Sequence, residues 1–523
     1  MPWLAGCGAE AASDDAAENG GTGGSAPSGG KSSGGTSSTA GGSAGKGAGG
    51  GGGAPTSGAG GSSSSGAGVG GSGQVAGSDN SGGASSGAAN AGSSGAAAGG
   101  SAGTGASGSS GTGNAAGVGG GFAGGSGGGP MFPPLDCGAE GWAVEDHGPP
   151  SNRVNYVILG DGYTAETVNT TLVEHVNTAL RRRFETESGQ PYLRYRNFVN
   201  ICVMKAVSQN DGIGNGPTAF DGGNGGDRLA RVNGQKVDAY LREQLPEEIE
   251  VDWKAVVLNQ DLWENTGSAL MLWSGANDEA PGAALHEGGH GFHQLADEYC
   301  GSNTGTRCGD DTEGTGSIGE EYEEVNSTGN PLTTGGKWDL WIGSEQKGMS
   351  VPDRGATGIQ STFIGSRYTD SGQYRPSANS MMNSLFTENV NTSFNSVSRE
   401  QIIFTIWRAV RPIDSTEPPA GTSEAPAAVE DPATLSVYVV DPAVINVDWT
   451  VDGVVTENGG TSFDTSVLGA GTHTVVARAY DNADMDLVRL RTGVCPPDVV
   501  RQYCSAPAWK NSEQTVAWTF TKP

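Results

Sequence analysis

Hydrophobic and polar positions change their period along the chain, and the change separates two folded regions. Between residues 131 and 412, short apolar runs suited to buried strands alternate with segments of helical period. We expect strands at 154–159, 195–207 and 253–260, a fourth, antiparallel edge strand at 268–274, and helices at 164–185, 281–296 and 397–410. This alternation predicts an α/β (α+β) domain with a mixed sheet. The basic run at 181–183 is expected on the solvent-exposed face of the first helix.

Beyond residue 430 the hydrophobic period becomes two. The runs TLSVYVV, INVDWTVDG, HTVVARAYD and TVAWTF are separated by turn residues, a pattern typical of a small all-β sandwich of the immunoglobulin-like type. We assign residues 431–523 to this sandwich and residues 413–430, which are rich in Pro, Ala and acidic residues, to a linker.

The first quarter of the chain shows neither period. Residues 8–130 are almost entirely Gly, Ser, Ala and Thr, and they offer too few apolar side chains to offset the conformational entropy that ordering would remove. We predict a long disordered tether here. The folded part of the chain is therefore expected to begin at about residue 131.

The chain begins MPWLAGCGAE, and Leu4-Ala5-Gly6-Cys7 resembles the lipobox of bacterial lipoproteins. The resemblance implies that Cys7 is lipidated and anchors the tether to a membrane. Only three residues precede the box, so residues 1–7 are either the end of a truncated signal sequence or a chance match. The first interpretation places the protein outside the cytoplasm, as a cell-surface lipoprotein or a secreted protein.

Six cysteines remain after Cys7, and an even number in an exported chain favours disulfides. Two pairs, Cys300 with Cys308 and Cys495 with Cys504, are close enough in sequence to close local loops. Cys137 and Cys202 would then form the third pair. No CxxC-like spacing occurs, which argues against a cysteine metal site.

The charge of the chain restricts its partners. The 58 acidic residues outnumber the 29 basic ones, for a net charge of −29, which argues against nucleic acid or an anionic membrane surface as a partner. No apolar run approaches the roughly 20 residues of a membrane-spanning helix. Contact with a membrane is therefore expected only through a lipid on Cys7, and we expect a monomer.

The strongest chemical signal is HEGGHGFHQLADEY, residues 286–299, which holds three of the six histidines of the chain. His286 and His290 are four residues apart on the predicted helix, so their imidazoles share one face and suit a tetrahedral zinc ion. Glu287 follows the first histidine and can act as general base on a water activated by the metal. Gly288, Gly289 and Gly291 are poor helix formers, and we interpret them as room for the metal and substrate to approach the backbone.

A tetrahedral catalytic site needs a third protein ligand. If the helix ends near Leu295, the chain can turn and bring Asp297 or Glu298 to the metal. His293 lies on the same face but is harder to combine with the other two on one straight helix. The candidates are, in order, Asp297, Glu298 and His293, around a single zinc ion.

The motif HEGGHGFHQLADEY resembles the HExGHxxxxLxDEY signature of the M64 metallopeptidases, the IgA-peptidase-like family, and VILGDGYTAET, VVLNQ and VNSTGNPLTTGGKWDLW are similar to other segments of that family. The resemblance implies a metzincin-like zinc endopeptidase domain over residues 131–412 that acts on a protein or peptide substrate. It supports Asp297 as third ligand, and Ser380-Met381-Met382-Asn383 resembles a Met-turn with Met382 beneath the metal. His293 and Ala296 stand where a typical metzincin has a glycine and a third histidine, so the ligand set departs from that pattern.

A second class of function fits the same architecture. A surface adhesion protein, or a binder of glycans or proteins, could retain a catalytically inactive protease-like domain on the same tether. Glu287 separates the two hypotheses, because only an enzyme needs a general base at that position.

Overall fold

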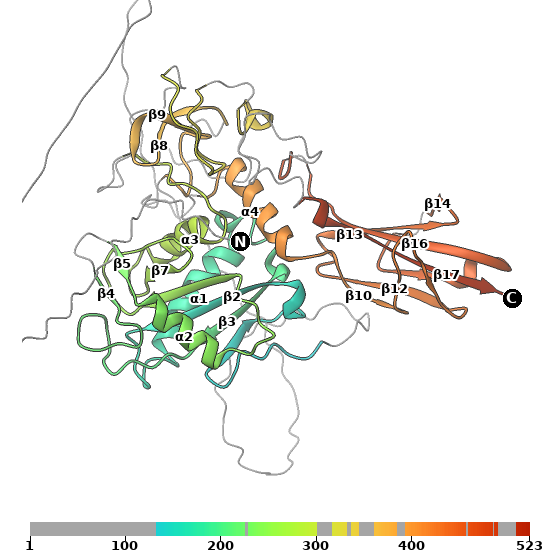
Figure 1. Ribbon diagram of the computed structural model, residues 1–523, viewed down its shortest axis with the longest axis horizontal. Helices are drawn as coiled ribbons and strands as arrows, with labels where there is room; N and C mark the ends of the chain where they lie inside the picture. Colours follow the sequence, from blue (N-terminus) through green and yellow to red (C-terminus); the bar gives the residue numbers. More distant parts are fainter. Residues whose placement is uncertain are drawn as a thin grey trace, which may run out of the picture. The chain divides into compact units, whose positions relative to one another are not determined.

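The computed structural model describes residues 132–224, 229–300, 316–331, 336–344, 360–383, 393–456, 459–484, 486–489 and 509–523 (Figure 1). The tether predicted at 8–130, together with Cys7, Cys308, Cys495 and Cys504, lies outside these residues. The described part holds four α-helices and several β-sheets. None of its helices is long and apolar enough to span a membrane.

A five-stranded mixed sheet forms the centre of the first region, in the order β1-β3-β2-β6-β7. Its strands are β1 (Gly141–Glu145), β2 (Val154–Asp161), β3 (Val199–Met204), β6 (Trp253–Leu258) and β7 (Met271–Ser274). The predicted strands at 154–159 and 253–260 are confirmed, and the one at 195–207 is confirmed over Val199–Met204 only, because residues 196–198 form a short 3-10 helix. β1 is antiparallel to β3, whereas the other neighbours are parallel.

The prediction of an antiparallel edge strand at 268–274 is wrong in direction. β7 lies at the edge of the sheet but runs parallel to β6. The antiparallel element is the incoming chain, because Thr266 and Leu272 exchange backbone hydrogen bonds of 2.8 and 3.0 Å. The connection from β6 thus reverses before β7 begins, and it partly covers the outer edge of β7.

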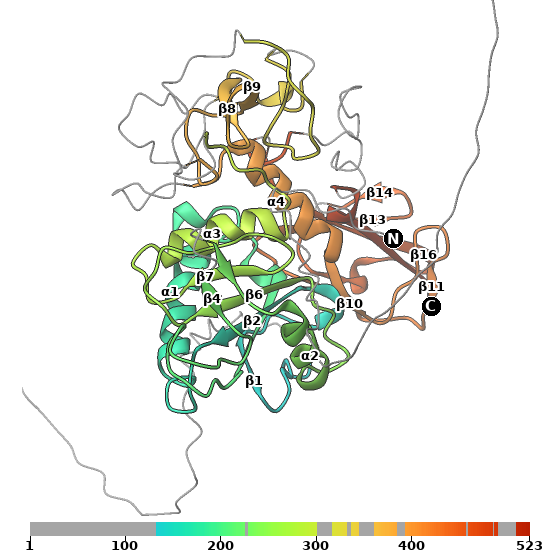
Figure 2. The same ribbon diagram turned by 60° about the vertical axis from the view of Figure 1, so that its left-hand side comes forward.

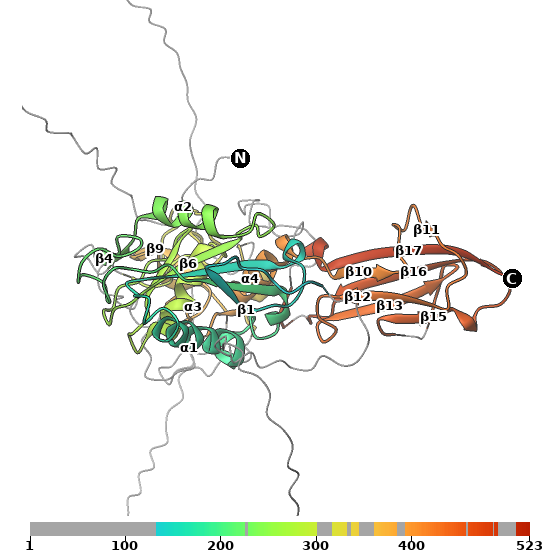
Figure 3. The ribbon, with the colours of Figure 1, turned by 90° about the horizontal axis from the view of Figure 1, so that it is seen from below.

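Alternate residues of the central strands face two separate cores, as the period of two in a strand requires. One core is shared with α1 (Thr171–Glu185) and α3 (Ala280–Gly291), and it contains, from β2, Tyr156 and Ile158. The other is shared with α2 (Gly234–Gln244), and it contains, from β2, Val157 and Leu159. The sheet therefore lies between α2 on one face and α1 with α3 on the other (Figure 3).

Helix α1 ends at Glu185 as predicted but begins later than expected. It begins at Thr171 instead of 164, because residues 164–170 close tight turns, in which Thr164 accepts backbone hydrogen bonds from Thr167 and Val168. Near its other end, Arg183 is only 2% exposed, so the expected solvent-exposed basic face is wrong there. Its guanidinium lies 4.4 Å from the ring centroid of Trp253, where cation–π attraction offsets part of the cost of burial.

Helix α3 packs against α1 and β7 (Figure 2) and ends earlier than predicted. It stops at Gly291, whereas the sequence suggested residue 296. After it, Gln294 adopts φ +56° and Leu295 donates a backbone hydrogen bond to Gly289 at 2.9 Å. The chain therefore turns back toward the helix before it reaches Asp297.

The predicted helix at 397–410 is confirmed as α4 (Ser396–Ala409). Its N-cap is Asn395, whose side chain accepts a hydrogen bond from the backbone of Ser398 at 2.9 Å. Two short antiparallel pairs lie elsewhere in the region, β4 (Gly223–Asn224) with β5 (Ala230–Arg231) and β8 (Phe363–Ser366) with β9 (Thr369–Arg375).

The C-terminal region consists of two sheets, β10-β12-β15 and β11-β17-β16-β13-β14. Their strands are β10 (Ile413–Glu417), β11 (Ala427–Ala428), β12 (Thr434–Val439), β13 (Ile445–Val451), β14 (Val454–Val455), β15 (Ser462–Asp464), β16 (Gly471–Asp481) and β17 (Glu513–Lys522). The segment expected as a linker, 413–430, supplies β10 and β11, because its backbone pairs with β12 and β17.

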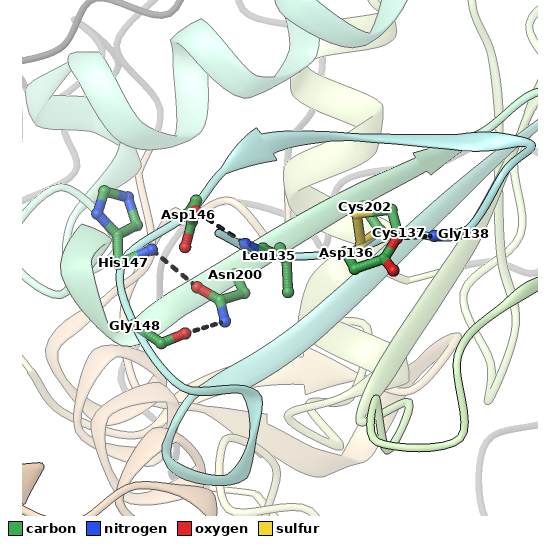
Figure 4. The surroundings of a disulfide bond; sticks show 9 residues. All are labelled: Leu135, Asp136, Cys137, Gly138, Asp146, His147, Gly148, Asn200 and Cys202. Carbon is green, nitrogen blue, oxygen red and sulfur yellow. Dashed lines mark hydrogen bonds between the residues drawn. A yellow bond between two sulfur atoms is a disulfide. The ribbon is translucent and has the colours of Figure 1, made fainter. Parts of the chain in front are cut away.

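A disulfide joins Cys137 to Cys202 across the first edge of the central sheet (Figure 4). It ties the segment before β1 to β3. Asn200, also on β3, accepts a hydrogen bond from His147 and donates one to the Gly148 carbonyl, both at 2.9 Å. The pairing expected by elimination is confirmed, and the disulfide is compatible with an extracellular location. Cys300 is also disulfide-bonded, while its predicted partner Cys308 lies outside the described residues.

We expect the double variant Cys137→Ala/Cys202→Ala to lose about 2–4 kcal/mol of unfolding free energy, because the bond closes a loop of 65 residues and restricts the unfolded chain. Urea unfolding in oxidising buffer measures the difference from the wild type. In reducing buffer both proteins lack this bond, so the difference should shrink. A difference that persists in reductant would mean that side-chain packing, and not the cross-link, carries the effect.

Candidate metal centre

Helix α3 carries two histidines whose ring nitrogens face one another. The Nε2 atoms of His286 and His290 lie 3.1 Å apart. Each ring is fixed through its other nitrogen, because Nδ1 of His286 donates to the Met381 carbonyl at 2.9 Å and Nδ1 of His290 to the Leu295 carbonyl at 2.7 Å. A carbonyl only accepts, so each Nδ1 holds the proton and each Nε2 presents a lone pair to its neighbour.

Asp297 completes a triangle with these two nitrogens. Its Oδ1 lies 3.0 Å from Nε2 of His286 and 3.1 Å from Nε2 of His290. The turn at residues 292–296 makes this approach possible, since the carboxylate comes from outside the helix. Asp297 is only 6% exposed. Burial alone would raise the pKa of its carboxyl, whereas the imidazoles of His290 and His286, when protonated, lower that pKa well below its usual range.

The triangle fits a divalent metal ion. Three atoms that each carry a lone pair converge within 3.1 Å of one another in a buried position. A tetrahedral ion with ligand bonds of about 2.0–2.1 Å places neighbouring ligand atoms roughly 3.3 Å apart, close to the observed spacing. A cation at the centre would relieve the mutual repulsion of the three atoms, and two histidines with one carboxylate are ligands that zinc accepts.

Glu287 lies beside this triangle with its carboxylate under the chain that leads into β7. An ideal Cβ built on Gly267 would stand 2.6 Å from Oε2 of Glu287 and 2.6 Å from Cδ2 of His290, so the glycine backbone packs directly on both side chains. Burial raises the pKa of Glu287, and the two nearby imidazoles oppose the rise. A buried carboxylate with a raised pKa accepts and returns a proton more readily than an exposed one.

The other two candidate ligands, Glu298 and His293, point elsewhere. The Glu298 carboxylate accepts hydrogen bonds from Ser380 at 2.5 Å, Asn326 at 2.9 Å and Asn395 at 2.8 Å. His293 is fully buried and contacts the ring of Trp253 at 5.6 Å between centroids. Neither is among the three residues whose ligand atoms converge.

Met382 lies beneath the helix at the level of the two histidines. Its sulfur would be 2.6 Å from a Cβ placed on Gly289, and its side chain is completely buried. The backbone of Glu298 donates to the Met382 carbonyl at 2.7 Å. The segment around Met382 thus supports both the helix, from below, and the residue next to Asp297.

The glycines of the motif serve packing between parts of the protein. A Cβ on Gly288 would meet the ring of Trp253 at 2.8 Å, and one on Gly291 would meet the Ser268 carbonyl at 2.6 Å. Our interpretation that these glycines admit metal and substrate finds no support in these contacts. They let the strands, the chain before β7 and Met382 approach the helix closely enough to fix its position.

Two parts of this site were not predicted from the sequence. One is Gly267, which lies outside any motif and has no periodic signal. The other is Tyr368, at the turn between β8 and β9, whose hydroxyl donates to Oδ2 of Asp297. Only the polar composition of its neighbourhood was visible in the sequence.

A comparison with protein-family models matches residues 143–353 to the IgA peptidase M64 family. Residues 143–353 belong to the M64 family. The matched range includes the helix with His286, Glu287 and His290 as well as Asp297. No curated protein matches the chain.

The family gives the M64 domain a class of activity. M64 proteins are metallopeptidases, so the domain is a hydrolase of peptide bonds, and its substrate is a protein or a peptide. The convergent His-His-Asp triangle is the place in the described residues where such a metal could bind.

Replacing Gly267 by alanine should lower the peptidase activity strongly. The new Cβ forces Glu287 or His290 to move by about 1 Å, and a displacement of that size in a catalytic group can cost on the order of 100-fold in rate. The matched control is Gly234→Ala at the start of α2, where a Cβ meets nothing within 4 Å. Initial rates on casein for both variants test this, and equal losses would show that the contact at Gly267 is not the cause.

Proposed function

We propose that the protein is a zinc-dependent endopeptidase, secreted or anchored at the cell surface. The observation that carries the proposal is the triangle of His286, His290 and Asp297, whose three ligand atoms lie within 3.1 Å of one another next to a buried Glu287. The family assignment supports a metal-dependent peptidase, and the ligand types favour one zinc ion.

Each residue of the site then has a separate task. A zinc ion held by the triangle would supply Lewis-acid chemistry to a water and to the scissile carbonyl. His286 and His290 offer their Nε2 lone pairs because their Nδ1 protons are held by backbone carbonyls. Glu287 accepts the proton of the attacking water and delivers it to the leaving amine nitrogen. Its burial excludes the bulk water that would otherwise exchange this proton.

The substrate backbone would lie along the chain before β7. Strand addition of the substrate to β7 is not proposed, because Leu272 of β7 already pairs with Thr266 on the outer edge. Gly267 packs on Glu287 and His290 instead, so the peptide is proposed to pass beside this residue with its scissile bond over the metal triangle.

Three finer assignments belong to the same proposal. Met382 acts as a Met-turn beneath the metal, which its burial against Gly289 supports. The domain is proposed to be metzincin-like, with Asp297 in place of the third histidine. The two C-terminal sheets are proposed to form an immunoglobulin-like sandwich.

The disulfide Cys137–Cys202 supports an extracytoplasmic location. We propose that a lipid on Cys7 and the Gly/Ser-rich tether hold the monomeric enzyme at the cell surface. An inactive adhesion protein would have no use for a buried carboxylate at Glu287, which costs stability without a catalytic return.

Glu287→Gln should reduce casein cleavage by about 100-fold or more, because the amide has the same shape but cannot accept a proton. Metal content should remain near one ion per chain, since Glu287 is not a ligand. A chelator should abolish the activity of the wild type, and added zinc should restore it. The matched control is the exposed Glu166→Gln, which should behave as the wild type. Undiminished activity of Glu287→Gln would favour a different mechanism.

Two isosteric substitutions test the third ligand. Asp297→Asn should weaken zinc binding by more than the 10–100-fold that is typical of an outer-shell partner. Glu298→Gln should leave zinc binding nearly intact and lower the unfolding free energy by about 1–3 kcal/mol, because it breaks a buried hydrogen bond. Chelator competition and urea unfolding of the metal-free variants measure the two effects. The reverse pattern would assign the ligand to Glu298.

A further inference from the structure

The two oxygens of Asp297 have different partners. Oδ1 faces the Nε2 atoms of His286 and His290, and Oδ2 accepts a hydrogen bond from the hydroxyl of Tyr368. A carboxylate held in this way can offer only one oxygen to a metal. The direction of that oxygen then depends on the group that holds the other one.

Tyr368 is placed by an unusual turn. The hairpin β8–β9 closes over two residues, Arg367 and Tyr368, since Ser366 pairs with Thr369. Both turn residues have positive φ, +51° and +64°. A two-residue turn of this kind favours Asn and Gly, and bulky residues in the left-handed region are strained by about 1–2 kcal/mol each. Strain at a residue that contacts a metal-ligand candidate points to a functional constraint.

The turn is fastened to the segment that carries Asp297. The backbone of Arg367 donates to the Asp297 carbonyl at 2.9 Å, and that of Tyr368 donates to the Tyr299 carbonyl at 3.0 Å. The Ser366 hydroxyl donates to the Asp297 carbonyl at 3.0 Å. These bonds hold the turn against residues 297–299 without help from the Tyr368 hydroxyl. Tyr368 is 39% exposed, so burial of apolar surface does not explain its presence.

Tyr368 also contacts His286 indirectly, through the ring of Tyr299. Its side chain makes an edge contact with Tyr299, with 5.3 Å between centroids, and Tyr299 stacks on His286 at 6.3 Å. The turn therefore borders two of the three members of the triangle. Arg367 points to the other side, where its guanidinium lies 3.9 Å from the ring centroid of Tyr322.

From these contacts we infer that Tyr368 is a positioning residue for the metal centre. Its hydroxyl holds Oδ2 of Asp297 so that Oδ1 stays directed at the two imidazoles, and the strained turn exists to place that hydroxyl. The inference rests on the proposed function in one respect, namely that the triangle binds zinc.

The test is the zinc affinity of Tyr368→Phe, measured by chelator competition. Loss of an outer-shell hydrogen bond should raise the Kd by about 10–100-fold, while the melting temperature of the metal-free protein stays the same because the turn bonds remain. The absorption spectrum of the cobalt-loaded variant should change, since the orientation of a ligand oxygen changes. The matched control is Tyr438→Phe, which also removes a hydroxyl bonded to a carboxylate, at 3.0 Å from Glu417 in the C-terminal sheets.

A second variant, Tyr368→Asn, separates positioning from a purely structural role. Asparagine tolerates positive φ, so the metal-free protein should melt at the same or a higher temperature, while its zinc affinity falls as in Tyr368→Phe. A Kd within about twofold of the wild type in both variants would overturn the inference. If the wild type itself fails to bind zinc, the proposed function fails instead, which is a different result.

Discussion

Three electron-rich atoms are held within 3.1 Å of one another in the interior of the M64 domain, and most of the site is arranged to keep them there. The two imidazole nitrogens and the carboxylate oxygen repel one another unless a cation lies between them. The protein resists that repulsion from outside the triangle, since two backbone carbonyls fix the imidazoles and the β8–β9 turn fixes Asp297. A metal ion would then meet a site that is already organised, so little ordering has to accompany binding.

Glu298 shows how a neighbouring acid serves the same end without facing the triangle. It connects three separate segments, through Asn326, Ser380 and the helix cap Asn395. Burial raises its pKa, while these hydrogen bonds act in the opposite direction. Asp297 and Glu298 are adjacent in sequence but point to different partners, one toward the histidines and the other into the scaffold. Two adjacent side chains of one dipeptide thus fulfil both tasks.

Helix α3 has a low intrinsic helix stability, and the same glycines that lower it allow close packing. Three glycines in one motif weaken α3 by up to about 1 kcal/mol each relative to alanine. In return, Trp253, Met382 and the chain at Ser268 approach the helix more closely than a Cβ would allow. The buried Arg183 adds to this support, because its guanidinium donates to the Ala284 carbonyl of α3 and lies over Trp253. The histidines thus sit on a helix that is positioned by its neighbours.

The central strands, the helix with its two histidines and the disulfide between Cys137 and Cys202 were predicted from the sequence alone. These depend on local periodicity, on a four-residue spacing or on counting cysteines, and all three can be read along one chain. Tertiary structure decided the direction of β7, the burial of Arg183, the strands within 413–430 and the contacts of Gly267 and Tyr368 with the site. Each of these depends on which segments, distant in sequence, pack against one another. Local sequence patterns do not predict such contacts.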